Sequence, residues 1–514
     1  MGPHLELIDI LVVVGYLAAI LGMSAYIARR QHTGYDYFLA GRAMPGSLLA
    51  LSIIANQASA ISLIGAPAFV ALRAGGGLAW LQYELALPLA MLAAMVLLLP
   101  ALRSVTGPSI YEYAERRFGQ GTRRTLAAAF LLSRGLALGV ALYASAIVVS
   151  AALGWRLDLA IVAIGVFALA YTSLGGIVAD IWSDVVQLVL LWGGTLAGAG
   201  FVLARHGREV LHAIPAERTQ ALVPGWGVGP EGTFDFWPML IGGLFLYLSY
   251  YACDQSQAQR LLTARSDGEA RKALLWNGLL RFPLVLSYCL LGLLLAGLLA
   301  SDTGFAARLA GQPPDSLVPT FMMEYLPGGL RGLMFAGLLA AAMSSIDSAM
   351  NSLAAVTIED VFQRDPSTQP AWIGRLASVG WGVFSVGSAM AFARTGSGVL
   401  ELVNLIGSAF YGPILAVFVL GVATSGVRSR GAVAGLLGGL AANVLLSRLV
   451  PSLSWLWWNP AGFLAALAVA FAVTREPIGV IRPAWPRREA RWLIGAFAAM
   501  LLTLAVLPTL LRLK

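Results

Sequence analysis

Long apolar runs separated by short polar segments occupy the chain from end to end. A helix needs about 20 apolar residues to cross the hydrocarbon core of a bilayer, where backbone groups must be paired internally. The pattern therefore predicts an all-α integral membrane protein with about fourteen transmembrane helices. The runs lie near residues 9–28, 46–72, 77–101, 124–153, 158–176, 182–203, 236–253, 273–299, 330–357, 372–394, 400–424, 428–448, 454–473 and 490–511.

Composition supports the same class of protein. Of 514 residues, 58% are hydrophobic and 12% are charged, whereas a soluble domain carries about 25% charged residues. The longest polar segments, near 204–235, 300–329 and 474–489, are too short for a soluble domain. With no GxxxxGK[ST] loop present, these features argue against an ATP-driven pump and against a receptor with an attached signalling module.

The first apolar run, near 9–28, has no basic segment before it and no small-residue cleavage pattern, and Arg29 and Arg30 follow it. We expect a retained transmembrane helix here, not a signal peptide.

The net charge of +8 reflects basic residues in short loops, a topology signal and not a nucleic-acid patch. With an external N-terminus, 21 of the 34 Lys and Arg residues, Arg260 among them, fall in cytoplasmic loops and 11 fall outside. This bias predicts both termini outside a plasma (inner) membrane that the chain crosses many times.

Polar residues interrupt the second run, which contains Asn56, Gln57, Ser59 and Ser62. Small polar side chains can mediate helix packing in a membrane. The alternative is a helix locally unwound around a ligand, with carbonyls free for a cation. The residues alone leave both interpretations open.

The ninth run carries Ala341, Ser344, Ser345 and Ser348 on one helical face, with Asp347 one turn after Ser344. Hydroxyl, carbonyl and carboxylate oxygens are hard ligands that suit Na+ as they suit other hard cations. Hydrogen bonding between helices is the alternative for the serines, but it explains a buried aspartate poorly.

Asp184 and Gln187 lie near the start of the sixth run. Asp184 can be a solvated residue that caps that helix, or part of a polar site.

Other polar groups stand alone in apolar runs: Gln82, Glu84, Arg134, Arg281 and Glu401. Each arginine can pair with a carboxylate of the protein, or bind an anionic solute in bidentate fashion.

Catalytic constellations are missing from the sequence. None of the four histidines lies in an apolar run, and there is no HExxH or GxSxG motif. Without a nucleophile or metal cluster, we do not expect an enzyme.

Seven segments, in order along the chain, resemble the sodium/solute symporter family. They are Asp36–Arg42, Ser52–Pro67, Tyr111–Phe118, Gly175–Gln187, Asp254-Gln255 with Gln259-Arg260, Ser344–Asp360, and Gly407–Gly421. The resemblance implies a LeuT-type fold with two inverted five-helix repeats, at 46–203 and 236–424. An N-terminal helix and cytoplasmic link (1–45) would precede them, and three helices (425–514) would follow.

The residues give this repeat modest support. Pro88 and Pro283 fall in the second helix of each repeat, and Gly242-Gly243 interrupt the first helix of the second repeat.

The resemblance also implies sodium sites. The main site maps to the carbonyls of Ala55, Ala58 and Ala341 and the hydroxyls of Ser344 and Ser345. A second site, present in some members, maps to Asp184, Ser344, Asp347 and Ser348. Asp347 stands where sialic acid carriers have serine, so the number of ions, one or two, stays open.

The family's solute positions map to Gln57, Ser59, Ser62 and Gln82. Arg281 stands where a sugar carrier has a substrate-contacting lysine, and Arg134 lies about one turn from the arginine that binds carboxylate in sialic acid carriers. Leu405 replaces the glutamine of the sugar carriers, which weakens a sugar assignment.

Together these features predict a secondary active transporter in which Na+ is the coupling ion for symport of a small organic solute. The arginines favour an organic anion such as a monocarboxylate or sugar acid. Alternatives are a neutral sugar or amino acid, proton coupling through Asp347 or Asp184, and a membrane sensor or channel without coupled transport. The expected partners are the solute and the lipid bilayer, with no nucleic acid and no obligate protein partner.

Overall fold

The computed structural model describes residues 5–58, 60–229, 232–364, 369–394, 399–474, 479–480 and 485–512. It is an all-α structure apart from two short antiparallel strands, β1 (Thr424–Ser425) and β2 (Gly479–Val480). The α-helices are α1 (Leu7–Ala28), α2 (Gly34–Leu39), α3 (Gly46–Gln57), α4 (Ala60–Leu72), α5 (Ala86–Ala93), α6 (Leu99–Arg103), α7 (Tyr111–Phe118), α8 (Gln120–Leu153), α9 (Leu157–Ala213), α10 (Gly243–Cys253), α11 (Gln255–Leu262), α12 (Asp267–Ser301), α13 (Thr303–Leu309), α14 (Leu317–Tyr325), α15 (Leu330–Val356), α16 (Ala371–Ala393), α17 (Val399–Ala423), α18 (Ser429–Leu449), α19 (Trp458–Val473) and α20 (Arg487–Arg512).

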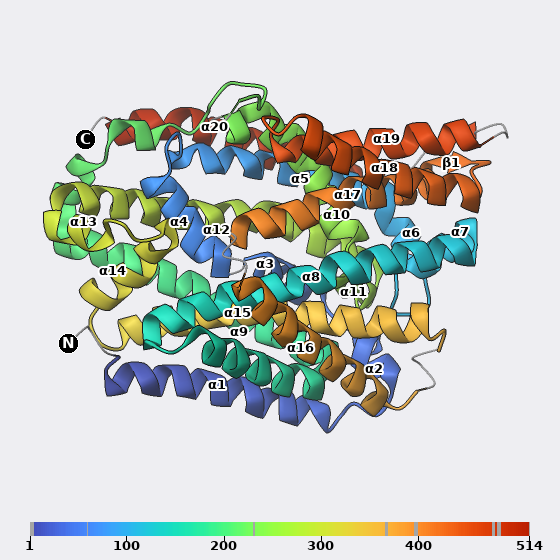
Figure 1. Cartoon of the computed structure of the whole chain (residues 1–514), viewed down its shortest axis with the longest axis horizontal. Helices are drawn as coiled ribbons and strands as arrows, with labels where there is room; N and C mark the ends of the chain where they lie inside the picture. Colours follow the sequence, from blue (N-terminus) through green and yellow to red (C-terminus); the bar gives the residue numbers. More distant parts are fainter. Residues whose placement is uncertain are drawn as a thin grey trace.

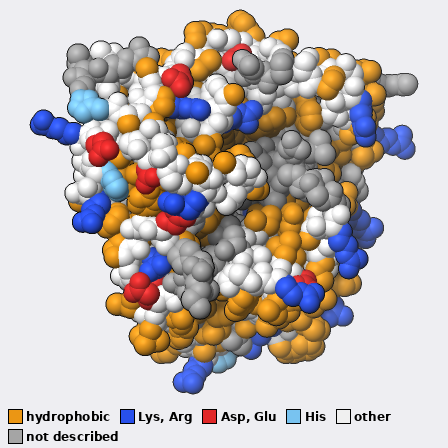
Figure 2. Space-filling model, turned by 60° about the vertical axis from the view of Figure 1, so that its left-hand side comes forward, with side chains coloured by type: hydrophobic (Ala, Val, Ile, Leu, Met, Phe, Trp, Pro, Cys, Tyr) orange, Lys and Arg blue, Asp and Glu red, His pale blue; other side chains and the backbone are white. Residues whose placement is uncertain are grey.

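The long helices run side by side in one bundle, with α1 beginning and α20 ending at the same end of it (Figure 1). Hydrophobic side chains cover much of the surface in Figure 2, and charged side chains gather toward its left and right ends. This distribution fits helices that cross a bilayer and expose their charges at its two faces.

Within the described ranges, eleven helices are long and apolar enough to cross a membrane, and a bent pair, α3 with α4, makes a twelfth. Two further predicted segments coincide with shorter apolar helices, Leu157–Ala170 and Pro238–Cys253. The count of fourteen therefore stays a prediction.

The predicted spans at 158–176 and 182–203 are joined in α9, which kinks at Gly176. Gly176 has φ +54°, and a Cβ atom there would lie 2.6 Å from the Tyr37 carbonyl oxygen. Only glycine combines that backbone angle with so close an approach. The kink redirects the helix before it reaches Asp180 and Asp184.

The polar interruption of the second run is a break in the helix. Gly46–Gln57 and Ser62–Leu72 are inclined by 55°, and Ala58 leaves helical geometry with ψ 73°. The four last carbonyls of a helix have no partner within that helix. The break therefore presents the carbonyl end of α3 inside the bundle.

The predicted interruption at Gly242-Gly243 is wrong. The helix passes from a π-helical turn, η6 (Pro238–Gly242), into α10 with helical angles at both glycines. The chain instead breaks at Asp254, whose side chain accepts the Ser256 N–H at the start of α11. Gly242 serves close packing, since a Cβ atom there would lie 2.6 Å from the Leu456 carbonyl oxygen.

A buried carboxylate fastens α1 to the start of α15. Asp9 accepts hydrogen bonds from the Gly329 and Gly332 N–H groups at 2.7 and 2.8 Å, and Arg331 donates to it at 3.0 Å. Arg331 also reaches Glu6 at 2.7 Å. A carboxylate at a helix N-terminus is favoured by free amides and by the helix dipole, so α1 and α15 are held together at this end.

Candidate functional site

The broken end of α3 lies against the middle of α15. The Ser345 hydroxyl donates to the Asn56 carbonyl at 3.1 Å. Ala55 and Ala58 on one side, and Ala341 and Ser344 on the other, are all buried. The structure thus brings the five predicted residues of the main sodium site to adjoining elements.

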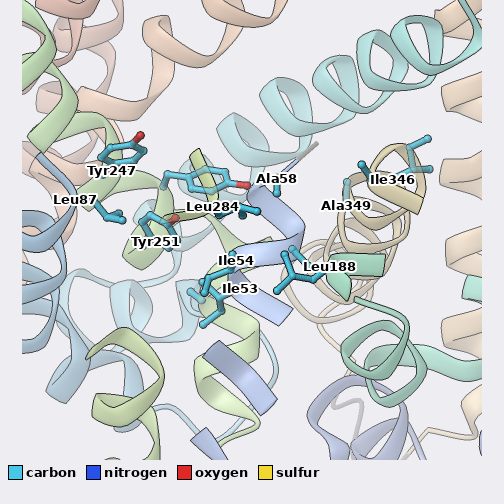
Figure 3. Close-up of a cluster of buried hydrophobic side chains, with 14 of the residues drawn as sticks. Ile53, Ile54, Ala58, Leu87, Leu188, Tyr247, Tyr251, Leu284, Ile346 and Ala349 are labelled. Carbon is cyan, nitrogen blue, oxygen red and sulfur yellow. The ribbon is translucent and has the colours of Figure 1, made fainter. Parts of the chain in front are cut away.

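Apolar side chains surround this junction. Figure 3 shows Ala58 between Tyr247 and Tyr251 of α10 and Ile346 and Ala349 of α15. Such packing excludes water, and in a low-dielectric setting carbonyl and hydroxyl oxygens attract a cation more strongly. The carbonyl end of a helix adds the negative end of its dipole.

Three buried carboxylates meet beside this junction. Asp180, Asp184 and Asp347 each offer one oxygen, and these oxygens lie within 4.8 Å of one another. Asp180 and Asp184 share a face of α9 by their i, i+4 spacing, and α15 packs on that face. Carboxylates this close repel one another unless cations lie among them.

One positive charge among these carboxylates comes from a side chain of the protein, Arg260. Arg260, at the end of α11, lies 2.7 Å from Asp184 and 3.1 Å from Asp180, and none of its surface is exposed. The prediction that Arg260 lies in a cytoplasmic loop is wrong for its side chain, which is buried inside the bundle. The surrounding sequence is polar, but tertiary contacts with α3, α9 and α15 bury the guanidinium.

The two oxygens of Asp184 have different partners. Oδ2 accepts from Arg260 and, at 2.5 Å, from the Ser52 hydroxyl of α3, whereas Oδ1 accepts from the Ser344 hydroxyl. A hydroxyl that donates its proton keeps lone pairs for a cation. The interpretation of Asp184 as a solvated helix cap is wrong, because it is fully buried inside α9.

Ser348 completes the second predicted site. Its hydroxyl donates to the Ser344 carbonyl at 2.7 Å and lies 3.3 Å from Asp180 and 3.4 Å from Asp347. The structure therefore brings together all four predicted members of this site, Asp184, Ser344, Asp347 and Ser348.

The residues predicted to contact the solute differ in burial and in hydrogen bonding. Gln57 ends α3 with a buried amide oxygen that has no hydrogen-bond partner among the described residues, and Ser62 is half-buried in α4. Asn56 likewise has both amide atoms buried and unpartnered within the described part of the chain. Ser59 and the side chains of Glu401 and Leu405 lie outside the described residues.

Gln82 lies in the 3₁₀ helix η2 (Gly77–Leu85), and its amide is engaged by the protein. The amide nitrogen donates to the Phe234 carbonyl at 2.5 Å, and the amide oxygen accepts from the Val223 N–H at 3.1 Å. A solute would have to displace these bonds.

Arg134 and Arg281, the arginines within the predicted spans, both face carboxylates. Arg281 donates to Glu84 at 3.0 Å, and Tyr247 donates to the same carboxylate at 3.0 Å. Arg134 lies 3.8 Å from Asp254, at the break between α10 and α11. Arg281 keeps one buried nitrogen without a partner among the described residues, so a protein ion pair and a further anion contact are compatible there.

Two members of this centre were not expected as site residues, Asp180 and Arg260. Asp180 precedes Asp184 by one helical turn, a spacing visible in the sequence. Nothing local to Arg260 indicates burial, since its apolar surroundings come from elements far away in the chain.

Comparison with known proteins fits this arrangement. The model of the sodium:solute symporter family matches residues 37–439. The chain is 31% identical to the sodium-dependent multivitamin transporter of Oryctolagus cuniculus, with 85% of this chain and 69% of the relative covered. It is 28% identical to the sodium-coupled monocarboxylate transporter 1 of Homo sapiens, with 85% and 72% covered.

Among solved structures, that of a Na+-coupled sialic acid symporter matches with a TM-score of 0.82 at 23% identity, over 93% of this chain and 99% of that one. At this identity the likeness establishes the fold. With the family model spanning most of the sequence, the chain belongs to the sodium:solute symporter family and is a multi-pass membrane protein that couples symport of a small solute to Na+.

Proposed function

We propose that Na+ binds between the carbonyl end of α3 and the middle of α15. Its ligands are the carbonyls of Ala55, Ala58 and Ala341 and the hydroxyls of Ser344 and Ser345. The observation that carries the proposal is the Ser345 hydroxyl, 3.1 Å from the Asn56 carbonyl at the point where α3 ends. Broken helices that offer carbonyls to a cation are typical of secondary transporters.

A second cation is held by Asp184, Ser344, Asp347 and Ser348. Among the described residues, three carboxylates are paired with one guanidinium in this buried cluster, which leaves an excess of negative charge when all three are ionised. Na+ fits the oxygen ligands, and a proton on Asp347 or Asp184 is the alternative occupant.

The solute is a small organic anion such as a monocarboxylate or sugar acid. One relative is by name a transporter of monocarboxylates. Gln57, Ser59, Ser62, Gln82, Arg134 and Arg281 are the solute-facing residues of this proposal. The Arg281 guanidinium, which has one nitrogen without a partner among the described residues, supports an anion. A neutral sugar or amino acid would leave its charge unused.

Transport proceeds by alternating access in the plasma membrane. Two inverted five-helix repeats, 46–203 and 236–424, move against each other, with the N-terminal 1–45 and C-terminal 425–514 segments outside the repeats. Breaks in the first helix of the first repeat and at the end of the first helix of the second support this division. Each Na+ that moves inward across 100 mV supplies about 2.3 kcal/mol.

Na+-driven uptake by proteoliposomes tests the main site. Removing one ligand in Ser345→Ala is expected to raise the Na+ concentration for half-maximal uptake about tenfold, equivalent to about 1.4 kcal/mol. Ser352→Ala is the matched control, because among the described residues that hydroxyl bonds only to the carbonyls of Ser348 and Ala349 in its own helix. An unchanged Na+ requirement in Ser345→Ala would refute the assignment.

The solute class needs a separate assay. Purified protein is heated with monocarboxylates, sugar acids, neutral sugars and amino acids, with and without Na+. A true solute stabilises the protein by mass action, and more so when Na+ is present. Stabilisation by neutral sugars alone would overturn the proposal of an anion.

A further inference from the structure

The short helix α11 extends from the cation centre to the wall of a large cavity. That cavity, of about 820 Å³, lies at the end of the bundle opposite both termini, beside α2 and α7 (Figure 1). Pro108 forms part of its wall, and the Pro108 carbonyl accepts a hydrogen bond from the Gln255 side chain at 2.5 Å. Gln255 begins α11, and Arg260 of the same helix contacts Asp184. One helix therefore connects the cavity wall with the buried carboxylates.

Directed polar bonds hold α11 in place. Every residue of α11 is buried, although five of its eight side chains are polar. The Gln255 side chain also accepts the Ile110 N–H at 2.9 Å, and the Gln259 side chain donates to the Phe38 carbonyl at 2.9 Å. These partners are distant from α11 in the chain, so the closed position of the helix depends on a few long-range hydrogen bonds.

Arg260 supplies the charged contacts of α11. Its Nε donates to the Ser52 hydroxyl of α3 at 2.7 Å, and its Nη2 lies 2.7 Å from Asp184 and 3.1 Å from Asp180 of α9. One guanidinium thus joins α11 to two other helices. Because hydrogen bonds between ionised groups are roughly twice as strong as neutral ones, Arg260 contributes more to this closed position than either glutamine does.

The hydrogen bonding of α11 is incomplete in this closed position. The amide oxygens of Gln257 and Gln259 are buried without a hydrogen-bond partner among the described residues. Buried acceptors of this kind carry a desolvation cost, and they recover hydrogen bonds when water reaches them. Separation of α11 from its neighbours therefore costs less than separation of a fully bonded helix would.

We propose that α11 is a gate between the cation centre and the cavity, and that Arg260 is the positioning residue that keeps the gate closed. The coupling of this gate to Na+ rests on the second cation site proposed above, because that cation and Arg260 share Asp184. Two positive charges that bind the same group of carboxylates weaken each other's binding. A cation between Asp184 and Asp347 therefore favours opening, and once it has left, the negative cluster attracts Arg260 again and the gate closes.

Hydrogen exchange of purified protein in Na+-free buffer tests the gate itself, because exchange reports local opening. Asp180→Asn combined with Arg260→Gln removes one carboxylate and one guanidinium, so the net charge of the cluster is unchanged. Exchange at Gln255–Leu262 should be at least tenfold faster in this double variant, whereas α18 should exchange as in the wild type. Gln259→Ala removes a neutral bond of the same helix and should accelerate its exchange less than threefold.

A second control is Asp158→Asn with Arg156→Gln, which removes an exposed ion pair and should leave exchange of α11 unchanged. Unchanged exchange of α11 in Asp180→Asn with Arg260→Gln would overturn the gate. Equal acceleration in α11 and α18 would also overturn it, because that result indicates a general loss of stability.

Na+ tests the coupling in Ser345→Ala, a background that weakens the main sodium site. Na+ should accelerate exchange of α11 at least threefold relative to K+ at equal ionic strength, and adding Asp347→Asn should abolish that effect. No acceleration in Ser345→Ala, or equal acceleration in both variants, would overturn the coupling. If the ratio of charge to solute excludes a second cation, the comparison in Na+-free buffer still decides whether Arg260 keeps the gate closed.

Discussion

The Arg260 guanidinium lies 2.7 Å from the Asp184 carboxylate, and both side chains are fully buried. A charge fixed in the protein thus occupies one side of the acidic cluster, while Ser344 and Asp347 line another part of it. Electrostatic balance in this cluster affects both stability and cation binding.

Replacing Arg260 with Gln is expected to destabilise the protein strongly. Removing one partner of a buried ion pair costs about 3–5 kcal/mol, because the other charge stays buried. The measurement is thermal unfolding of purified protein, with Arg271→Gln on exposed α12 surface as the control. Adding Asp180→Asn should recover part of the loss; wild-type stability in Arg260→Gln would show that the pair is not needed.

Replacing Asp347 with Asn should change the number of charges moved per solute. If a second Na+ sits among Asp184, Asp347 and their serines, the variant loses one charge per cycle, and the Na+ dependence of uptake becomes less steep. Current and solute flux are measured together in proteoliposomes. Asp158→Asn, in a surface pair with Arg156, is the control.

An unchanged ratio of charge to solute in Asp347→Asn would remove that residue from the second site. Uptake driven by a pH gradient in Na+-free buffer tests the remaining alternative, which is coupling to a proton. If it drives uptake by the wild type but not by the variant, the second cation is a proton.

Glu84 and Arg281 should have opposite effects on an anionic solute. Glu84 compensates the guanidinium and competes with a solute carboxylate, so Glu84→Gln should bind anions more tightly while losing stability. Arg281→Gln should abolish the thermal shift caused by the anion. Arg103→Gln, paired with exposed Asp267, is the control. A full thermal shift in Arg281→Gln would mean that the pair is purely structural.

Acid should weaken the loop that joins α12 to α15. A hydrogen bond from Tyr325 and another from the Phe305 N–H hold the pKa of Asp302 below its ordinary value. Because the folded pKa is lowered, this stabilisation is present above the pKa of the unfolded chain and is lost as pH falls through the folded pKa.

Asp302→Asn keeps an acceptor at the start of α13 but removes the titrating charge. Hydrogen exchange of α13 and α14 should therefore depend less on acid in the variant than in the wild type. Equal acid dependence in both proteins would contradict the assignment to Asp302.

The apolar runs predicted most helix positions, because in lipid the length and hydrophobicity of a segment determine whether it can cross. The break after Gln57 was one of two interpretations of the polar residues that interrupt an apolar run there, and helix packing was the other. The predicted interruption at Gly242 and Gly243 was wrong because glycine favours close helix packing as well as helix unwinding. Only the packed structure reveals that Gly242 meets the Leu456 backbone.

Only part of the acidic cluster could be predicted, because local spacing shows which residues of one helix lie together but not which distant elements pack on them. Spacing on one helix placed Ser344, Asp347 and Ser348 together, and the same rule connects Asp180 with Asp184. The burial of Arg260 could not be read from its neighbours, which are polar and resemble a loop. It depends on long-range contacts with Ser52 and Asp184 that no local pattern encodes.

The Asp9 contact has a mechanical consequence. Because α1 is fastened to the first turn of α15 and packs along α9 and α15, these helices should travel as one rigid unit. A spectroscopic label on Leu11, which faces outward on α1, would then report the displacement of the helix that carries Ser344 and Ser345 without touching any ligand. Movement of the label on α1 would therefore report movement of α15, whose ligand-bearing segment is buried.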